Sequence, residues 1–264
     1  MAMNTNTELP TTGSFVANKC TVPDNSPSAI NPIIISIEGN IGSGKSTFMH
    51  VLMTKYKDRS DVLFLDEPVS VWNTVTDSSG VTILEHYYAD PHKYAFSFQM
   101  MAYISRISVL LKTIKMRKYS IIITERSVFT DLNIFAKMLY DDKKINEIEY
   151  RIYMQWFDEF TADLPKVNII YMRTSPQTAN DRVIKRGRLG ETIPLEYLAN
   201  CHEYHEKWLM SENTNEDLPA AYFESKTSNI NNIMCIDAND EVIDCKEKWF
   251  KRASLFIETI HNIF

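Results

Sequence analysis

Several features are scarce or missing in this 264-residue sequence, and each one excludes a class of protein. The four cysteines are scattered and form no C-x-x-C pair, so we expect free thiols rather than a disulfide framework or a metal site. No apolar run approaches the roughly 20 residues of a membrane-spanning helix, so no membrane partner is expected. The N-terminus shows neither the apolar core of a secretion signal nor the Arg-rich pattern of an import signal, which predicts a cytoplasmic protein.

An excess of positive charge is also missing. The net charge of −6 argues against nonspecific binding to nucleic acid, which needs a cationic surface, but it leaves room for a local basic pocket. Residues 1–31 are rich in Thr, Asn, Ser and Pro and are predicted to form a disordered tail. The remaining residues, 32–264, are numerous enough for one large α/β domain with a well-buried core.

The most informative stretch runs from residue 33 to residue 47. The β-branched run at 33–37 predicts a buried strand, and a helical pattern through Lys55 follows the loop. Between them lies the phosphate-binding pattern Gly-x-x-x-x-Gly-Lys-Ser, whose backbone N–H groups converge on a polyphosphate at a helix N-terminus. The loop therefore predicts binding of a nucleoside triphosphate with Mg²⁺, and its donor-binding residues are Gly39, Asn40, Ile41, Gly42, Ser43, Gly44, Lys45, Ser46 and Thr47.

Further apolar runs at 61–66, 120–124, 167–172 and 232–236 predict four more strands. The residues between them read mainly as helices, with a long one at 94–116 after a break at Pro91, whereas 212–229 is polar and loop-like. Strands that alternate with helices in this way predict an α/β fold, in which a five-stranded parallel sheet carries helices on both faces.

Two acidic residues follow predicted strands directly. Glu67 ends the strand at 61–66, and Glu125 ends the strand at 120–124. In open α/β sheets, ligands bind outside the carboxyl ends of the strands, where the phosphate-binding loop also lies. Glu125 matches the second acidic group that such enzymes keep for Mg²⁺, whereas Glu67 is either a site residue or a solvated loop acid.

Polar residues on two predicted helices are further candidates. Gln99 and Arg106 are seven residues apart and share one helix face, so they either contact a polar ligand or lie at a surface edge. The helix from Pro176 carries Arg182 and Arg186 one turn apart. Arg188 follows them, which favours an Arg-rich lid over phosphates rather than a solvated basic face.

These motifs occur together and in order, and with them the sequence resembles the deoxynucleoside kinases, the group that contains deoxycytidine, deoxyguanosine and mitochondrial-type thymidine kinases. The resemblance covers about residues 33–264. It rests on Gly39–Thr47, Glu67-Pro-Val-x-x-Trp72, Phe98-Gln99, Glu125-Arg-Ser127, Arg182-x-x-x-Arg186-Gly-Arg188 and Ile193-Pro-Leu-Glu-Tyr197.

The resemblance implies a P-loop kinase that uses ATP and Mg²⁺ to phosphorylate the 5′-hydroxyl of a deoxynucleoside. It implies that Glu67 is the general base and that Arg126 holds this carboxylate in place. It also implies that Lys45, Arg186 and Arg188 neutralise the transferring phosphoryl group, and that Ser46 and Glu125 hold Mg²⁺. A homodimer is implied as well, supported by the apolar helix around Trp156.

For the nucleoside pocket, the resemblance implies that Gln99 pairs with the base edge and that Phe135 stacks on the base. Other assignments follow in the same way. They place Trp72, Leu84 and Phe98 in the pocket wall, Tyr87 where it narrows the pocket near the base, Ile41 at the sugar, Tyr88 and Glu191 at the 3′-hydroxyl, Arg182 on the donor side, and Asp237 to Val242, including Asp240 and Glu241, over the donor's base.

Substrate choice is inferred from Ala102, Arg106 and Asp131, which match the deoxycytidine and deoxyguanosine kinase pattern better than the thymidine kinase pattern. We therefore expect purine deoxynucleosides and deoxycytidine to be preferred over thymidine. Two alternatives stay open from the sequence. One is a nucleoside monophosphate kinase of the thymidylate kinase type, and the other is a non-catalytic structural relative.

Overall fold

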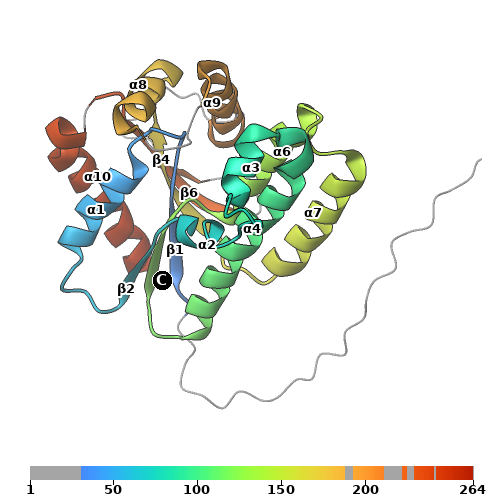
Figure 1. The fold of residues 1–264 in the computed structure, drawn as a ribbon. Coiled ribbons are helices and arrows are strands. Elements are labelled where there is room, and N and C mark those ends of the chain that lie inside the picture. Colours follow the sequence, from blue (N-terminus) through green and yellow to red (C-terminus); the bar gives the residue numbers. More distant parts are fainter. Residues whose placement is uncertain (1–30, 188–192, 211–221, 225–228, 241, 264) are drawn as a thin grey trace, which may run out of the picture.

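The computed structural model describes residues 31–187, 193–210, 222–224, 229–240 and 242–263 (Figure 1). Within these residues, six strands form one sheet in the order β2-β3-β1-β4-β6-β5. The strands are β1 (Ile33–Glu38), β2 (Val62–Leu65), β3 (Ile121–Glu125), β4 (Val167–Arg173), β5 (Tyr222–Glu224) and β6 (Ile230–Asp237).

The five predicted strands are confirmed, and all of them pair in parallel. The prediction that residues 212–229 form only a loop is wrong for Tyr222–Glu224, because β5 adds to the sheet edge antiparallel to β6. Three residues are too few to show a periodic pattern, and their pairing depends on the neighbouring strand rather than on local sequence.

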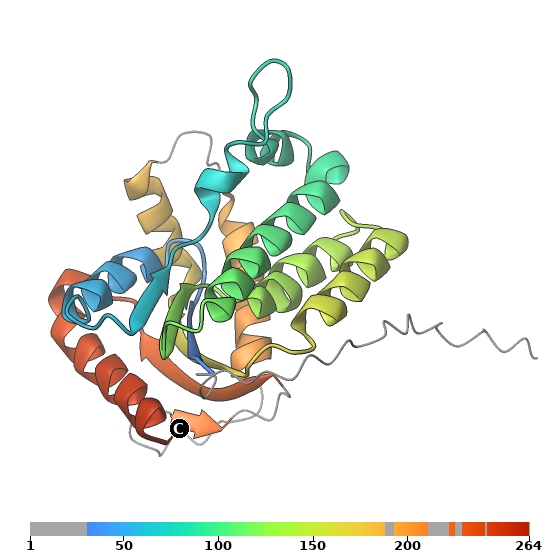
Figure 2. The same ribbon diagram turned by 90° about the horizontal axis from the view of Figure 1, so that it is seen from below.

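Helices cover both faces of the sheet (Figures 1 and 2). They are α1 (Lys45–Lys55), α2 (Val69–Trp72), α3 (Ile83–Ala89), α4 (Pro91–Lys115), α5 (Val128–Thr130), the π-helical turn η1 (Asp131–Ala136), α6 (Lys137–Asp141), α7 (Glu147–Thr161), α8 (Pro176–Arg186), α9 (Leu195–Leu209) and α10 (Val242–Ile263).

The alternation of β1 side chains divides the core into two layers. Ile35 and Ile37 pack with Phe48 of α1 and Phe256 of α10 on one face. Ile34 packs on the other face with α4, α7 and their neighbours. Successive side chains of a strand point to opposite faces, so a continuous apolar run is what a strand covered by helices on both sides requires.

The long helix α4 begins earlier than predicted. The predicted break is present, because α3 ends at Ala89 and Asp90 is not helical, but Pro91 itself occupies the first turn of α4. The side chain of Asp90 accepts a hydrogen bond from the backbone N–H of Lys93. Proline lacks an N–H and is pre-organised for this position, so it starts a helix as readily as it ends one. The predicted helix around 127–139 is also interrupted, because Asp131–Ala136 form the π-helical turn η1.

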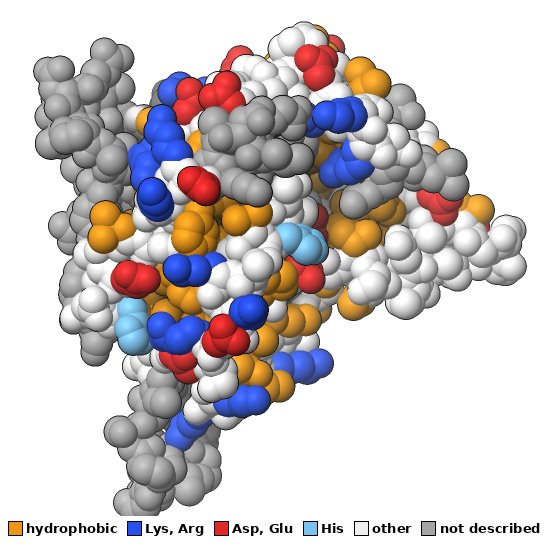
Figure 3. All heavy atoms as spheres, turned by 90° about the vertical axis from the view of Figure 1, so that its left-hand side faces the viewer, with side chains coloured by type: hydrophobic (Ala, Val, Ile, Leu, Met, Phe, Trp, Pro, Cys, Tyr) orange, Lys and Arg blue, Asp and Glu red, His pale blue; other side chains and the backbone are white. Residues whose placement is uncertain are grey.

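Two observations concern the helices and one face of the described region. None of its helices combines the length and apolar character needed to cross a membrane. On the face seen in Figure 3, Lys and Arg side chains are interspersed with acidic and hydrophobic ones, so the described part of this face presents no continuous basic surface. Nonspecific binding to nucleic acid needs such a surface.

Candidate active site

The phosphate-binding loop lies between β1 and α1, as its sequence predicts. Gly44 caps α1 in a left-handed conformation with φ of 92°. The Lys45 ammonium is buried and donates hydrogen bonds to the backbone carbonyls of Gly39 at 3.0 Å and Asn40 at 2.7 Å. Burial, followed by the nearby Arg126, lowers the pKa of Lys45 to about 7. The lysine is therefore held at the loop, where it can meet an anionic ligand.

Part of the loop is structural rather than directed to a ligand. The Asn40 side chain donates to the backbone carbonyl of Leu198 in α9 at 2.8 Å and accepts from the N–H of Ile41 at 2.8 Å. Gly39 is packed so closely that a Cβ atom there would lie 2.6 Å from the carbonyl oxygen of Met172. Gly39, Asn40 and Ser43 do not line the main cavity, and the contacts of Gly39 and Asn40 fix the loop to β4 and α9.

An oxygen pair suited to Mg²⁺ lies at the start of α1. The Ser46 hydroxyl donates to the Glu125 carboxylate at 2.8 Å, which brings the P-loop and the end of β3 together. Within the described ranges, no group of three or more His, Cys, Asp or Glu side chains is arranged to hold a metal ion. Mg²⁺ is usually held by one or two protein oxygens together with substrate phosphates and water, so this donor set fits that ion.

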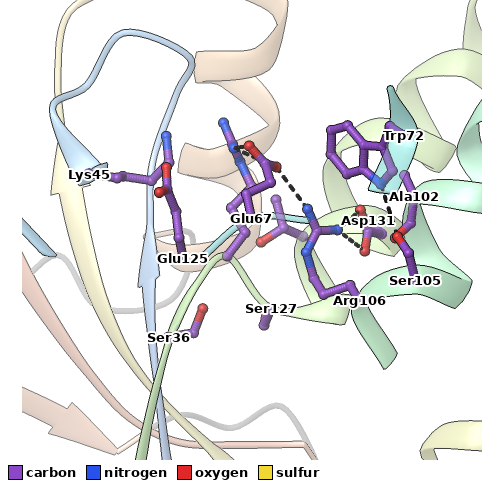
Figure 4. Close-up of polar contacts among 12 residues, drawn as sticks. Ser36, Lys45, Glu67, Trp72, Ala102, Ser105, Arg106, Glu125, Ser127 and Asp131 are labelled. Carbon is purple, nitrogen blue, oxygen red and sulfur yellow. Dashed lines mark hydrogen bonds and ion pairs between the residues drawn. The ribbon is translucent and has the colours of Figure 1, made fainter. Parts of the chain in front are cut away.

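Glu67 lies in the loop after β2, between two arginines (Figure 4). Arg126 donates through Nη1 to both carboxylate oxygens, at 2.9 and 3.0 Å, and Arg106 donates through Nη2 to one of them at 2.8 Å. Burial disfavours the charged carboxylate, but the attraction of Arg126, Arg106 and Lys45 outweighs it and holds the pKa of Glu67 below its usual range. Glu67 is therefore an ionised carboxylate held by two arginines rather than a solvated loop acid.

Arg126 is placed by an unusual backbone conformation. Its φ is 63°, a left-handed value that costs a non-glycine residue free energy, and its N–H donates to the carbonyl of Ile37 at 3.1 Å. Glu38 fixes the next residue, because its buried carboxylate accepts from the backbone N–H of Ser127 at 2.9 Å and from the hydroxyl of Thr130. Sequence reasoning missed this role of Glu38, although an acidic residue ending a buried apolar strand is a usable signal.

The site opens into one cavity of about 770 Å³ that runs from the P-loop to α3, α4 and η1. It brings together most residues assigned to the donor, the metal and the nucleoside. Those that line it are Ile41, Gly42, Gly44, Lys45, Ser46, Thr47, Glu67, Trp72, Leu84, Tyr87, Tyr88, Phe98, Gln99, Arg106, Glu125, Arg126, Asp131, Phe135, Arg182 and Arg186.

Aromatic rings and one ion pair shape the nucleoside side of this cavity. Phe98 stacks on Tyr87, with ring centroids 4.8 Å apart, and meets Trp72 edge-on at 5.5 Å. Arg106 donates through Nη1 to both carboxylate oxygens of Asp131, and the Gln99 amide donates to the backbone carbonyl of Asp131 at 3.1 Å. Arg106 and Asp131 therefore form an ion pair beside Gln99, in the same cavity as the aromatic rings.

The donor side of the cavity has basic residues from α8. The guanidinium of Arg182 donates to the backbone carbonyls of Ala238 at 2.8 Å, Asn239 at 3.1 Å and Asp240 at 2.5 Å. It therefore holds the loop that follows β6, and Asp240 is placed in that loop rather than in the cavity lining. Arg188, Glu191 and Glu241 lie outside the described residues, and Val242 is described only as the first residue of α10.

Several further residues line the cavity without having been assigned to it from the sequence: His50, Asp66, Val69, Glu85, Leu139, Lys185 and Tyr197. His50 is one turn beyond Ser46 on α1, so the helical period from the P-loop could have identified it. Leu139 and Tyr197 reach the cavity only because α6 and α9 pack beside it, which no local pattern reveals.

The comparisons with known proteins agree with this geometry. Residues 35–260 match the family model described as deoxynucleoside kinase. The chain is 34% identical to human deoxycytidine kinase (86% of this chain and 91% of that protein) and 36% identical to deoxycytidine kinase 1 of Xenopus laevis (81% and 85%). It is also 32% identical to the mitochondrial deoxyguanosine kinase of Xenopus laevis (68% and 74%). The match spans nearly the whole folded region, and the chain belongs to the deoxynucleoside kinase family.

Proposed function

We propose that the protein transfers the γ-phosphoryl group of ATP to the 5′-hydroxyl of a deoxyribonucleoside. The observation that carries this proposal is the single cavity in which Lys45, at the phosphate-binding loop, and Glu67, an ionised carboxylate, share one space. A neutral hydroxyl acceptor must lose a proton as it attacks, and Glu67 supplies the oxygen that accepts it.

In the proposed reaction, the 5′-oxygen forms a bond to the γ-phosphorus while the bond to the β-phosphate oxygen breaks and ADP leaves. The hydroxyl proton moves to Glu67, which Arg126 holds in place. Lys45, with Arg186 from α8, would neutralise charge on the transferring group. Alignment in such sites contributes about 7–11 kcal/mol, and a positioned base contributes about 10²–10⁴-fold more.

Ser46 and Glu125 are the residues proposed to hold Mg²⁺, supported by their 2.8 Å contact beside the P-loop. When bound, the ion would neutralise phosphate charge and orient the donor. The Arg-rich lid is also part of the proposal, with Arg186 on α8 at the cavity and Arg188 beyond the described segment.

The proposed acceptors are purine deoxynucleosides and deoxycytidine in preference to thymidine. The buried Arg106–Asp131 pair beside Gln99 offers both donors and acceptors to a base edge that carries an amino group. The named relatives, deoxycytidine and deoxyguanosine kinases, support this choice. A monophosphate acceptor is less well matched, because Arg106 and Arg126 are already paired with carboxylates instead of facing a second phosphate.

A homodimer is proposed from the outer surface of α7. Four large side chains at helical spacing lie exposed there: Ile148, Ile152, Trp156 and Phe160. Trp156 and Phe160 stack with ring centroids 5.6 Å apart. An apolar stripe of this length suits contact with a second copy. We propose the cytoplasm as the compartment, since Cys201 and Cys235, the cysteines that the structure describes, are both free.

A substrate panel tests the proposal. The purified protein is assayed with ATP and Mg²⁺ against the four deoxynucleosides and their 5′-monophosphates. The expected result is phosphorylation of deoxycytidine or purine deoxynucleosides with the highest kcat/KM. A highest kcat/KM for thymidine would overturn the substrate preference. Phosphorylation of the monophosphates alone would identify a monophosphate kinase, and no phosphorylation of any acceptor would indicate a non-catalytic relative.

A further inference from the structure

Arg106 contacts two carboxylates that serve different parts of the proposed reaction. Its Nη1 donates to Asp131, which lies on the nucleobase side, and its Nη2 donates to Glu67 at 2.8 Å (Figure 4). Arg126 then pairs with the same Glu67 carboxylate at 2.9 Å. The four residues form a charge chain, Asp131–Arg106–Glu67–Arg126, in which Asp131 is 1% exposed and Arg106 is 7% exposed.

The Trp72 ring packs against this charge chain where the four residues line the cavity. The Arg106 guanidinium carbon lies 6.0 Å from the centre of the Trp72 ring, and the Trp72 indole N–H donates to Ser105 at 2.9 Å, which fixes the ring (Figure 4). Arg106 and Asp131 are buried, so solvent screens the interactions of these charges less than it screens charges at the surface. A change at one end of the chain therefore reaches the other end.

The remaining charged groups around the chain come from three other elements. Lys45 faces it from the P-loop, Glu38 from β1 and Glu125 from the end of β3. Two phenols, Tyr103 and Tyr153, lie near Asp131, and burial raises the pKa of each well above its ordinary value, so both stay neutral. Arg106 is thus the only described cation in direct contact with both carboxylates.

We infer that Arg106 is a positioning residue that couples recognition of the nucleobase at Asp131 to the proton affinity of Glu67. One guanidinium is shared by two carboxylates, so the charge of each carboxylate weakens the attraction between Arg106 and the other carboxylate. A nucleobase amino group that donates to Asp131 offsets part of the Asp131 charge, and the field of Arg106 at Glu67 grows. Glu67 then stays ionised to a lower pH when a nucleobase with an amino group is bound.

This inference rests on the proposed function, because it assigns the fall in kcat at low pH, the acidic limb of the rate profile, to protonation of Glu67. Burial raises the pKa of Asp131 to about 6, so Asp131 titrates in the same range, and the Asp131→Asn variants remove that titration from the profile. The test measures kcat between pH 4 and 9, at saturating ATP and acceptor, for four proteins: wild type, Asp131→Asn, Arg106→Gln and the double variant. Arg106→Gln alone leaves a buried, unpaired Asp131 and is prone to misfold. The double variant replaces the ion pair with a neutral pair of similar shape, so it keeps the test usable.

Loss of an adjacent arginine removes a stabilising charge from Glu67. The acidic limb of the double variant is therefore expected roughly 1–3 pH units above that of Asp131→Asn. The acidic limb of Asp131→Asn is expected at the same pH as the wild-type limb or at a lower pH, because Glu67 is then the only carboxylate that pairs with Arg106. Asp141→Asn is the matched control, because Asp141 is a carboxylate of α6 that pairs with Lys137 at the surface, and its limb should coincide with the wild-type limb.

The coupling between the nucleobase and Glu67 is measured by comparing two acceptor nucleosides. In the wild type, the limb for deoxycytidine, which carries an amino group, is expected roughly half a pH unit below the limb for thymidine. Asp131→Asn should abolish that difference. Equal limbs for the two acceptors in the wild type, or variants that change KM and leave every limb unmoved, would overturn the inference and reduce Arg106 and Asp131 to binding residues.

A second readout separates this inference from the proposed function. The carboxyl ¹³C resonance of Glu67, assigned by its loss in Glu67→Gln, is titrated in each variant without turnover. If Glu67→Gln keeps near-normal kcat, the base role fails, and the ¹³C titration still reports whether Arg106 sets the proton affinity of Glu67. If Glu67→Gln loses turnover, but the titration of the Glu67 ¹³C resonance is the same in Asp131→Asn and in the Arg106→Gln/Asp131→Asn double variant, the inference alone fails.

Discussion

Substitution of Gly42 by alanine probes how the P-loop is seated. Gly42 has φ of 81°, and a Cβ atom there would lie 2.3 Å from the carbonyl oxygen of Ala179 and 3.0 Å from Val183 Cγ2. Both contacts are on α8, the helix that carries Arg182 and Arg186 into the cavity. A backbone carbonyl cannot swing aside as a flexible chain end can, so loop and helix must separate.

The magnitude follows from two contributions. A left-handed conformation costs an L-residue about 1–2 kcal/mol, and overpacking a close contact adds about 1–3 kcal/mol. Gly42→Ala is therefore expected to lower the free energy of unfolding by roughly 2–5 kcal/mol. Gly80→Ala is the matched control, because Gly80 has φ of 83° and nothing within 4 Å of the added Cβ, so only the conformational cost applies.

The assay combines urea unfolding with steady-state kinetics on both variants. Gly42→Ala should also raise the KM for ATP, because the loop N–H groups and the α8 arginines shift together, whereas Gly80→Ala should leave it unchanged. If the two variants lose the same stability and keep the same KM for ATP, the P-loop does not pack on α8 as described.

Three other outcomes follow from the structure. Burial lowers the pKa of Lys45 to about 7, so the free enzyme loses this charge as the pH rises. We therefore expect kcat/KM for ATP to fall above pH 7, while kcat at saturating ATP stays constant. A kcat/KM for ATP that is constant up to pH 9 would contradict this. Burial also lowers the pKa of His205 to about 3, against 6.5 for an unperturbed histidine, so the unfolded chain alone takes up a proton between those values and stability falls as pH drops below 6.5. From pH 6.5 to pH 5 the free energy of unfolding is expected to fall by about 2 kcal/mol through His205. The variant His205→Asn can still donate to the carbonyl of Cys201, so urea titrations at the two pH values should show a correspondingly smaller fall. Trp156→Arg should convert the proposed dimer to a monomer in sedimentation velocity, whereas an unchanged sedimentation coefficient would place the interface elsewhere.

Much of the site could be predicted from sequence because its chemistry is attached to local patterns. The P-loop is a contiguous motif, and Glu67 and Glu125 each follow an apolar run directly, so their place at one sheet edge needs only the parallel topology. The helix end predicted at Lys55 and the helix start predicted at Pro176 are also confirmed.

What sequence could not give is the set of contacts between distant elements. Arg106 and Glu67 are 39 residues apart, and their contact depends on how α4 is rotated against β2. The Asn40 side chain turns to Leu198, 158 residues away, instead of to a ligand. β5 pairs only because β6 offers an open edge. Each of these is decided by tertiary packing, which overrides local preference.

The most direct test of the account is the turnover of Glu67→Gln with ATP, Mg²⁺ and deoxycytidine. Glutamine keeps the shape of the side chain but cannot accept the 5′-hydroxyl proton. The account predicts a loss of kcat of about 10²–10⁴-fold, with the deoxycytidine Kd from equilibrium titration unchanged within a few-fold. Near-normal kcat in a variant that binds deoxycytidine normally would contradict the role of Glu67 as the base.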